Sequence, residues 1–492
     1  MIKQDGMMLS SYSTLYDIII GKDNFWRILN EMVDFDFIYE GLQNTYCSNF
    51  GRPGENPILM FKYLLLKSAS KLSDRDLIKK AVVDMEMKYF LGYAPEETEM
   101  IDPSLLSKFR HMRLRDTELL DILIRKTVEI ALEKGVIEAK NKIIVDSTHT
   151  NAMYHSKSAR EELLERCKEL RKAVYSTDSE MHEKMPAKPR ENGIYEDTVK
   201  YCKEVIEVVK AESRFKNYRG IQERLNYLEE GIEDCEKQLE FSKDEDAKVG
   251  HKTADSSFFG YKTHIAETPE RIITAATVTT GEKHDGKQLV SLIEKSEAAG
   301  IEVEAVIGDG AYSESDNIEY CKENEIKLAA KLSDSVVRGN RKKEDEFEYN
   351  KDAKMFVCPA GHMAIRKSSQ GSKKDKNGYD TRVITYFFDV EKCKHCPLKD
   401  GCYKEGAKSK TYSVKIKSDT HTEYMEFIKT DEYKELYSER YKIEAKNAEL
   451  KNNYDYENAQ SCGLSGMTIQ AGSTIFISNM KRIIKLMNSD KG

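Results

Sequence analysis

The sequence predicts an α/β core, a mixed sheet flanked by helices, with an all-helical N-terminal domain and two insertions. Three observations predict this arrangement. Residues 1–135 carry helix-start and helix-stop signals and no strand pattern. Short β-branched runs then recur in the order strand, strand, strand, helix, strand. Two stretches interrupt that order, and one of them is helix-forming and charged whereas the other is rich in cysteine.

Composition places the chain among globular proteins. It has 492 residues, of which 39% are hydrophobic and 33% charged, and its net charge is −7. No segment approaches the roughly 20 apolar residues of a membrane helix, and the N-terminus lacks a signal-peptide pattern. We therefore expect a cytoplasmic protein that does not bind membranes. The net charge argues against nonspecific coating of DNA, but local basic patches decide DNA binding.

The N-terminal domain, residues 1–135, contains two well-marked helix starts. Asn56 is a predicted N-cap with Pro57 at the first helical position. After a short break, Ser73 caps a second helix, with Asp76 three residues on, and Gly92 ends it. This pair of helices is either a DNA-binding helix-turn-helix or an ordinary helical hairpin.

The first core strand is interrupted almost at once by a helical insertion. Residues 142–148, KIIVDST, form a β-branched run, and residues 155–249 are almost entirely helix-forming and charged. Within that insertion an apolar stripe has spacings of 4, 3, 4, 3 and 4, and it consists of Ile221, Leu225, Leu228, Ile232, Cys235 and Leu239. Gly231 weakens the stripe, so we expect an inserted helical hairpin or arm.

The core then resumes and is interrupted once more. Strands are predicted at 258–267, 272–280 and 304–312, with a helix before Gly300 and a further strand at IKLAAKL. A cysteine-rich insertion covers 341–412. A long helix begins after Thr430 and meets no Gly or Pro before Asn453, and the tail 468–487 is also helical. The catalytic domain is therefore expected in three pieces, 140–154, 250–340 and 425–492.

Two aspartates stand at the ends of separate buried strands. Asp146 closes IIVD and Asp309 closes AVIGD. If those strands are neighbours, the carboxylates converge and repel unless divalent cations neutralise them. Mg²⁺ suits such an oxygen site, and two ions about 4 Å apart can activate an attacking oxygen and stabilise a leaving one. The alternative is that each aspartate only caps a turn.

The late helix supplies a third carboxylate. Tyr437, Arg440, Glu444 and Lys451 stand at offsets 0, 3, 7 and 14. On a continuous helix these positions lie within roughly 60° of arc. That face presents a carboxylate among phosphate-binding groups. A solvated charged face explains the same pattern, and periodicity alone does not separate the two interpretations.

The four late positions form a Y-x-x-R-x-x-x-E-x-x-x-x-x-x-K motif that resembles the signature of insertion-sequence transposases with an RNase H-like DDE catalytic domain. The order of the strands and of the two aspartates is similar as well. The stretches GRPGENPILMFKYLLL, LSDRDLI, MKYFLG and DPSLLSKFRHMRL look like the helical domain of the same proteins. The resemblance covers most of the chain.

The resemblance implies a DNA transposase. Asp146, Asp309 and Glu444 would hold Mg²⁺ or Mn²⁺, and Tyr437, Arg440 and Lys451 would contact the transposon-end backbone or position the glutamate; these are the residues that match the family motif. Water would cut each inverted-repeat end, and the freed 3′-hydroxyl would attack target DNA without a covalent protein–DNA intermediate. The implied partners are double-stranded DNA and a second copy of the chain, at the nucleoid. The single tryptophan does not decide whether a hairpin end forms.

Four cysteines cluster in the second insertion: Cys358, Cys393, Cys396 and Cys402. Four thiolates suit a structural, tetrahedral Zn²⁺, and His362 or His395 could replace one of them. Reduced thiols without a metal are the alternative. The neighbouring basic segment either contacts DNA phosphates or is a solvated loop, and its cations are Arg366, Lys367, Lys373, Lys374, Lys376 and Arg382.

Three other functions compete with transposition. An RNase H-like nuclease would cleave DNA without joining it, and a strand-transfer assay separates the two. A domesticated DNA-binding regulator would be expected to have lost a carboxylate, yet all three are present. A zinc-stabilised coiled-coil scaffold would leave the two strand-end aspartates unexplained.

Overall fold

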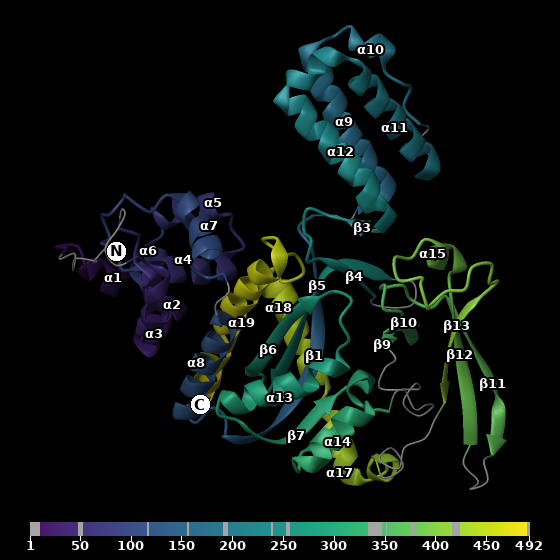
Figure 1. Cartoon of the computed structure of the whole chain (residues 1–492). Helices are drawn as coiled ribbons and strands as arrows, with labels where there is room; N and C mark the ends of the chain where they lie inside the picture. The colour runs from purple at the N-terminus through teal and green to yellow at the C-terminus, as the bar shows by residue number, and fades with distance from the viewer. Residues whose placement is uncertain are drawn as a thin grey trace. The chain divides into compact units, whose positions relative to one another are not determined.

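The structure is a computed structural model, and its chain divides into two compact units (Figure 1). The first unit comprises Met1–Met153, Asp246–Asn340 and Ile416–Gly492, and the second comprises Tyr154–Glu245 and Arg341–Lys415. The residues that the structure describes are 10–47, 53–115, 118–154, 157–189, 195–237, 240–251, 256–332, 347–350, 352–374, 380–415 and 424–489. Each unit is described by itself below.

The first unit begins with helices whose ends follow the predicted signals. They are α1 (Thr14–Ile19), α2 (Phe25–Met32), α3 (Asp36–Leu42), η1 (Gln43–Thr45), α4 (Pro57–Ser70), α5 (Asp74–Ala81), α6 (Met85–Leu91), α7 (Pro103–Met112) and α8 (Leu119–Glu133). Asn56 accepts a hydrogen bond from the Ile58 amide, and Ser73 accepts one from the Asp76 amide, so both predicted caps are confirmed.

One helix predicted in this region is in fact two. The segment from Ser73 to Gly92 contains a break, because the Asp84 carboxylate accepts a hydrogen bond from the Met87 amide and starts α6 as a separate helix. Gly92 then ends α6 in the left-handed conformation, with φ of 82°. The sequence interpretation noted the final glycine but overlooked the internal aspartate cap.

A six-stranded mixed sheet forms the centre of the first unit. Its strands are β1 (Lys140–Asn151), β4 (Lys248–His251), β5 (Ser257–Glu267), β6 (Ile273–Thr280), β7 (Glu302–Gly308) and β8 (Lys327–Ala330). The order is β4-β5-β1-β7-β8, and β6 also pairs with β5. The pairs β1–β7 and β7–β8 are parallel and the other pairs are antiparallel. The predicted strand order is confirmed, and β4 is an addition to it.

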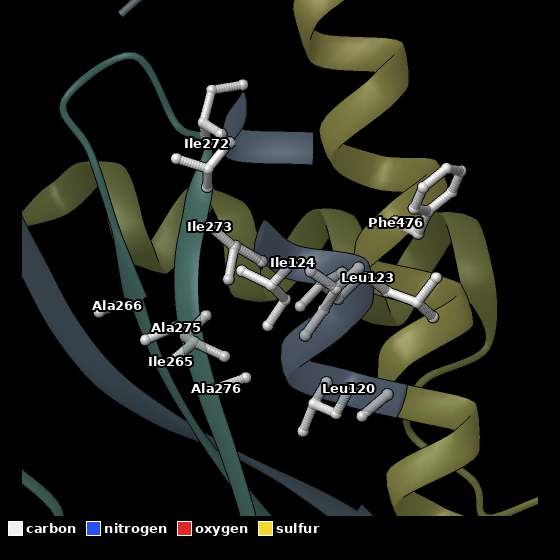
Figure 2. Packing of buried hydrophobic residues seen from close by; sticks show 14 of the residues in the cluster. Leu120, Leu123, Ile124, Ile265, Ala266, Ile272, Ile273, Ala275, Ala276 and Phe476 are labelled. Atoms are coloured by element: carbon white, nitrogen blue, oxygen red, sulfur yellow. The ribbon is translucent and has the colours of Figure 1, made fainter. Parts of the chain in front are cut away.

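Helices flank this sheet and close its core. They are η3 (Gly286–Gln288), α13 (Leu289–Ala298), η4 (Gly310–Tyr312), α14 (Ser315–Glu323), α17 (Asp431–Ser438), α18 (Tyr441–Tyr454) and α19 (Gly463–Ser489). Figure 2 shows Leu123 and Ile124 of α8 packed between Ile273 of β6 and Phe476 of α19. Burial of such apolar side chains supplies the main stabilising free energy of the unit. No helix among the described residues is both long and apolar enough to cross a membrane.

The predicted continuous helix after Thr430 is interrupted, and this prediction was wrong. Helix α17 ends at Ser438 and α18 begins at Tyr441. Between them the amides of Glu439 and Arg440 bond carbonyls only three residues earlier, which is the tighter 3₁₀ pattern. The Glu439 carboxylate accepts a hydrogen bond from Lys142 of β1 at 3.3 Å, which fixes the junction to the sheet. No Gly or Pro marks this bend.

The helical part of the second unit is a bundle and not the predicted hairpin. It contains α9 (Ala159–Thr177), α10 (Met181–Lys184), α11 (Tyr195–Ala211), η2 (Ser213–Asn217) and α12 (Arg219–Lys237), and its base is closed by β2 (Lys157–Ser158) paired with β3 (Glu240–Phe241). Helix α9 packs against both α11 and α12. Four stripe residues are buried in its core, namely Ile221, Leu225, Leu228 and Ile232, whereas Leu239 and the side chain of Cys235 lie outside the described part.

Gly231 does not weaken this bundle. A Cβ at Gly231 would lie 2.6 Å from Nη1 of Arg166 on α9. The Arg166 guanidinium lies 4.0 Å from the centre of the Tyr227 ring and donates to the Tyr227 carbonyl at 3.0 Å. The glycine therefore leaves space for an arginine that joins α9 to α12.

The rest of the second unit is made of small antiparallel sheets around the cysteines. It contains β9 (Glu348–Asn350), β10 (Met355–Val357), β11 (Arg366–Lys374), β12 (Asp380–Phe388), α15 (Val390–Lys394) and β13 (Lys410–Lys415). Strand β12 pairs with β11 and with β13. Phe356, Ile384, Tyr386 and Phe388 form a small core of their own. Of the basic segment, Lys376 lies outside the described residues, as do the side chains of Lys373, Lys374 and Arg382.

Candidate active site

The sheet register places Asp146 and Asp309 on neighbouring strands, although β1 continues past Asp146 to Asn151, so the prediction that Asp146 ends its strand was wrong. Ile144 of β1 pairs with Ile307 of the parallel neighbour β7. Two residues further along the chain are Asp146, which lies within β1, and Asp309, which directly follows β7, and neighbouring strands lie about 4.8 Å apart. Residues that face each other in a parallel pair point to the same face. The register therefore places Asp146 and Asp309 next to each other with their side chains on one face.

The turn after β7 orients the second aspartate. Oδ1 of Asp309 accepts a hydrogen bond from the Ala311 amide at 2.9 Å, which makes Asp309 the N-cap of η4. The Ser313 hydroxyl donates to the Gly310 carbonyl at 2.9 Å and closes the same turn. The position of the Asp309 carboxylate thus depends on the position of η4.

Arg440, at the junction of α17 and α18, lies among the acidic groups. Its Nη1 donates to Oε1 of Glu444 at 2.9 Å. Burial disfavours its charge, but nearby groups raise its pKa above the ordinary value, and these groups are Asp146, Asp309, Tyr437 and Glu444. All three predicted carboxylates are therefore within electrostatic reach of one guanidinium. The Glu444 side chain is 58% exposed.

Asn447 is a site residue that sequence reasoning missed. It lies three residues after Glu444 on α18, and its Nδ2 donates to Oδ2 of Asp146 at 3.2 Å. Its Oδ1 is buried and has no hydrogen-bond partner among the described residues. An amide carries no charge, so composition does not single it out. The available signal is its place between Glu444 and Lys451 on one helix.

Two further residues of the four-residue motif make local contacts. Nζ of Lys451 lies 3.3 Å from Nε2 of His149 on β1, and the His149 ring lies 5.0 Å from the ring of Phe258. The Tyr437 ring stacks on Tyr433 at 5.5 Å with an interplanar angle of 9°. Because α17 and α18 are separate helices, the four motif residues do not share one helix face as predicted. The break nevertheless keeps Arg440 beside Glu444.

The donor set of this site fits a hard divalent cation. Asp146 within β1 and Asp309 directly after β7 are carboxylates on neighbouring strands, and the buried Asn447 Oδ1 adds a third oxygen near Asp146. Mg²⁺ prefers such oxygen ligands and keeps several waters. Within the described ranges, no three His, Cys, Asp or Glu side chains already stand in a metal-binding arrangement. Glu444 instead pairs with Arg440.

Comparison with known families decides the class of protein. Residues 13–112 match the model of a transposase domain of the DUF772 type, and residues 357–484 match that of a transposase DDE domain. The chain is an insertion-sequence DDE transposase. The DDE match includes Glu444 and the other motif residues, whereas Asp146 and Asp309 lie outside it. Searches of curated proteins and of solved structures found no match to this transposase.

The family determines the reaction class of the transposase. It is a metal-dependent enzyme that cuts the DNA of transposon ends and joins it to target DNA. DDE domains generally use a divalent cation such as Mg²⁺. DNA is therefore the partner on which the transposase acts.

The four clustered cysteines of the transposase lie near one another in the second unit. All four are half-buried and none forms a disulfide. Burial raises the pKa of Cys358, the amides of His362 and Ala360 lower it, and Cys396 and Cys402 raise it further. Burial likewise raises the pKa of Cys393, with Cys358, Cys396 and Cys402 adding to the effect. Among the described residues, these four thiols do not form a group of three or more side chains that is arranged to hold a metal.

Proposed function

We propose that Asp146, Asp309 and Glu444 form the catalytic centre of this transposase on an RNase H-like core. The observation that carries the proposal is the β1–β7 register, which places Asp146, within β1, beside Asp309, directly after β7. The Arg440 guanidinium, within reach of all three carboxylates, supports the assignment of Glu444. The strand order, with three antiparallel strands before a parallel one, supports the RNase H-like core.

The residues of this centre would act by binding and orientation. Asp146 and Asp309 bind divalent cations, and Asn447 holds Oδ2 of Asp146 in place. The cations, when bound, generate a water nucleophile at neutral pH and stabilise the leaving oxygen of the phosphodiester. Glu444, which pairs with Arg440, would be the third residue to hold the cations, and the Arg440 guanidinium would suit bidentate binding to a DNA phosphate. The 3′-hydroxyl then attacks target DNA in the same site.

The remaining assignments concern DNA and assembly. Tyr437 and Lys451 contact the transposon-end backbone next to the catalytic centre. Helices α4 to α7, within the match to the transposase domain, bind the transposon end. Because two ends must be cut and joined together, the active complex contains two copies of the chain, and it acts at the nucleoid.

A strand-transfer assay with labelled transposon ends tests the catalytic assignment. The variants Asp146→Ala, Asp309→Ala and Glu444→Ala should each lose about 10³-fold or more of cleavage and joining, because several kcal/mol of charge stabilisation disappear. All three should bind end DNA as the wild type does. Glu435→Ala, at an exposed position of α17, is the matched control for the loss of a carboxylate. Undiminished joining by any of the three variants would overturn its assignment.

We propose further that Cys358, Cys393, Cys396 and Cys402 hold a structural zinc ion. The support is the donor chemistry, the mutual effect of the thiols on their pKa values, and the two amides that act on Cys358. Metal analysis of the purified protein should find one zinc per chain, and Cys396→Ser should remove it and destabilise the β9–β13 region. A wild-type protein without zinc, purified without chelators, would refute this assignment.

A further inference from the structure

A buried charged cluster lies beneath the candidate active site and is not part of it. Lys262 and His264 of β5 and Asp285, in the loop before η3, are at most 7% exposed. Nζ of Lys262 donates to Oδ1 of Asp285 at 3.1 Å and to the Lys283 carbonyl at 2.9 Å. Nδ1 of His264 lies 3.5 Å from the same Asp285 oxygen. Burying these charged groups costs free energy of desolvation, so we ask what role the cluster has in the structure.

The cluster lies on the opposite face of the sheet from the Asp146 side chain, because Lys262 pairs with His149 whereas Asp146 pairs with Ile265. Side chains alternate along β5, so Lys262 and His264 point away from the face that carries Thr263. The Thr263 hydroxyl contacts the hydroxyl of Tyr456, which follows α18. Asp146 shares the face of Thr263, so the Lys262–Asp285 pair lies opposite the Asp146 side chain and can affect the two aspartates through the backbone of the loop that it holds.

The loop that Lys262 anchors is packed directly on the turn that carries Asp309. A Cβ on Gly286 would lie 2.3 Å from the Ala311 carbonyl oxygen, so only glycine permits this approach. Nδ2 of Asn317 bridges the two segments by donating to the Gly286 carbonyl at 2.8 Å and to the Tyr312 carbonyl at 3.1 Å. Nδ1 of His284 also lies 3.5 Å from Oε1 of Glu314, just beyond the turn.

We propose that Lys262 is a positioning residue for Asp309. The Lys262–Asp285 pair fixes the loop 283–286, this loop supports η4, and η4 donates the Ala311 amide to the Asp309 carboxylate. A loop that moves by a fraction of an ångström would displace the Asp309 carboxylate, which would weaken the binding of a divalent cation. The inference rests on the proposed metal-binding role of Asp309.

Two variants remove the Lys262–Asp285 ion pair, and one variant keeps it. Lys262→Met deletes the charge, Asp285→Asn keeps the shape of its partner, and Lys262→Arg retains a buried cation. Lys88→Met is the matched control, because Lys88 is 4% exposed and donates to the Pro95 carbonyl in the N-terminal helices. The variant Asp285→Asn keeps the test available if Lys262→Met does not fold.

The first measurement is amide hydrogen exchange at Ala311 and Tyr312 in the metal-free protein. Exchange should be at least about tenfold faster in Lys262→Met and Asp285→Asn than in the wild type, because the turn loses its support. It should be unchanged in Lys88→Met. Unchanged exchange in both Lys262→Met and Asp285→Asn would overturn the proposal. This outcome does not depend on whether the proposed catalytic centre is correct.

The second measurement is Mn²⁺ binding by titration calorimetry, with Asp309→Ala as the reference for a lost site. Lys262→Met and Asp285→Asn should bind Mn²⁺ about 10- to 100-fold more weakly, and Lys262→Arg should retain most of the affinity. Equal weakening in Lys88→Met would reduce Lys262 to a general structural role and overturn the proposal. If the wild type and Asp309→Ala bind Mn²⁺ equally, the assignment of Asp309 as a metal ligand fails. The hydrogen-exchange result then still tests whether the Lys262–Asp285 pair supports the turn.

Discussion

At the scale of single residues, the candidate site depends on short polar contacts that combine distant parts of the sequence. Asn447 and Asp146 are 301 positions apart, yet they share a hydrogen bond of 3.2 Å. Asp146 and Asp309 were predicted as site residues because a carboxylate that follows an apolar run is conspicuous in the sequence. Asn447 was not, because an uncharged amide on a polar helix has no such marker and only the packing of α18 on β1 reveals its role.

Asn447→Ala should impair catalysis without impairing DNA binding. The substitution removes the donor to Asp146, so the carboxylate loses its orientation, and end cleavage should slow by about 10- to 100-fold. Single-turnover cleavage, measured beside end-DNA affinity, checks this. Asn453→Ala, on an exposed position near the end of the same helix, is the control. Equal rates in Asn447→Ala and Asn453→Ala would exclude a role for the amide.

At the scale of elements, buried charged side chains hold α18 between the sheet and α19. Lys446 is fully buried and donates to the hydroxyl of Ser478 on α19 at 3.0 Å. The Ser478 hydroxyl donates to Glu449 at 2.9 Å, and Arg271 donates to the same carboxylate at 2.7 Å. Hydrophobic periodicity does not predict such a buried interface, since a helix face that carries charged residues looks like a solvated face in the sequence. For the same reason, the sequence did not predict the break between α17 and α18 at Arg440.

Glu267, at the end of β5, should make the free energy of unfolding depend on pH. Burial raises the pKa of Glu267 from 4.5 to about 8, although the facing cations Lys446 and Arg271 oppose the shift. Between those values the folded chain holds a proton that the unfolded chain has released, so the free energy of unfolding should fall as pH rises from about 5 to about 8. Above that window the dependence should level off.

Urea unfolding of the wild type and Glu267→Gln across this pH range measures the effect. Glutamine cannot titrate, so the variant should show a flatter profile and should gain relative stability toward pH 8. Glu133→Gln, on an exposed position of α8, controls for the loss of a carboxylate. Parallel profiles for the wild type and Glu267→Gln would mean that the group does not titrate in this range.

At the scale of the whole molecule, insertions divide the core between its acidic residues. Residues 154–245 separate Asp146 from Asp309, and residues 341–415 separate Asp309 from Glu444. The sequence predicted both insertions because the strand pattern stops and resumes. It did not reveal that the first is a three-helix bundle or that the second contains the hairpin β11–β12, since the polar run RKSSQGSKK lacks the alternation of a half-buried strand.

The helical insertion should be removable. Its core is separate from that of the first unit, and β2 pairs with β3 at its base, so the two ends of the insertion meet. Replacing residues 159–239 by a short Gly-Ser linker should leave the main unfolding transition of the first unit within a few degrees of the wild type. Differential scanning calorimetry checks this. Loss of that transition, with the variant insoluble, would show that the core requires the bundle.

The central claim is that three carboxylates from β1, β7 and α18 share divalent cations. Iron-mediated cleavage of the protein tests it most directly: Fe²⁺ replaces Mg²⁺, and ascorbate with peroxide then generates hydroxyl radicals that cut the backbone next to the bound metal. A shared site predicts cuts around residues 146, 309 and 444, all suppressed by excess Mg²⁺ and by Asp146→Ala. Cuts confined to other segments, or cuts at residues 146 and 309 without any near 444 in the DNA-bound protein, would contradict it.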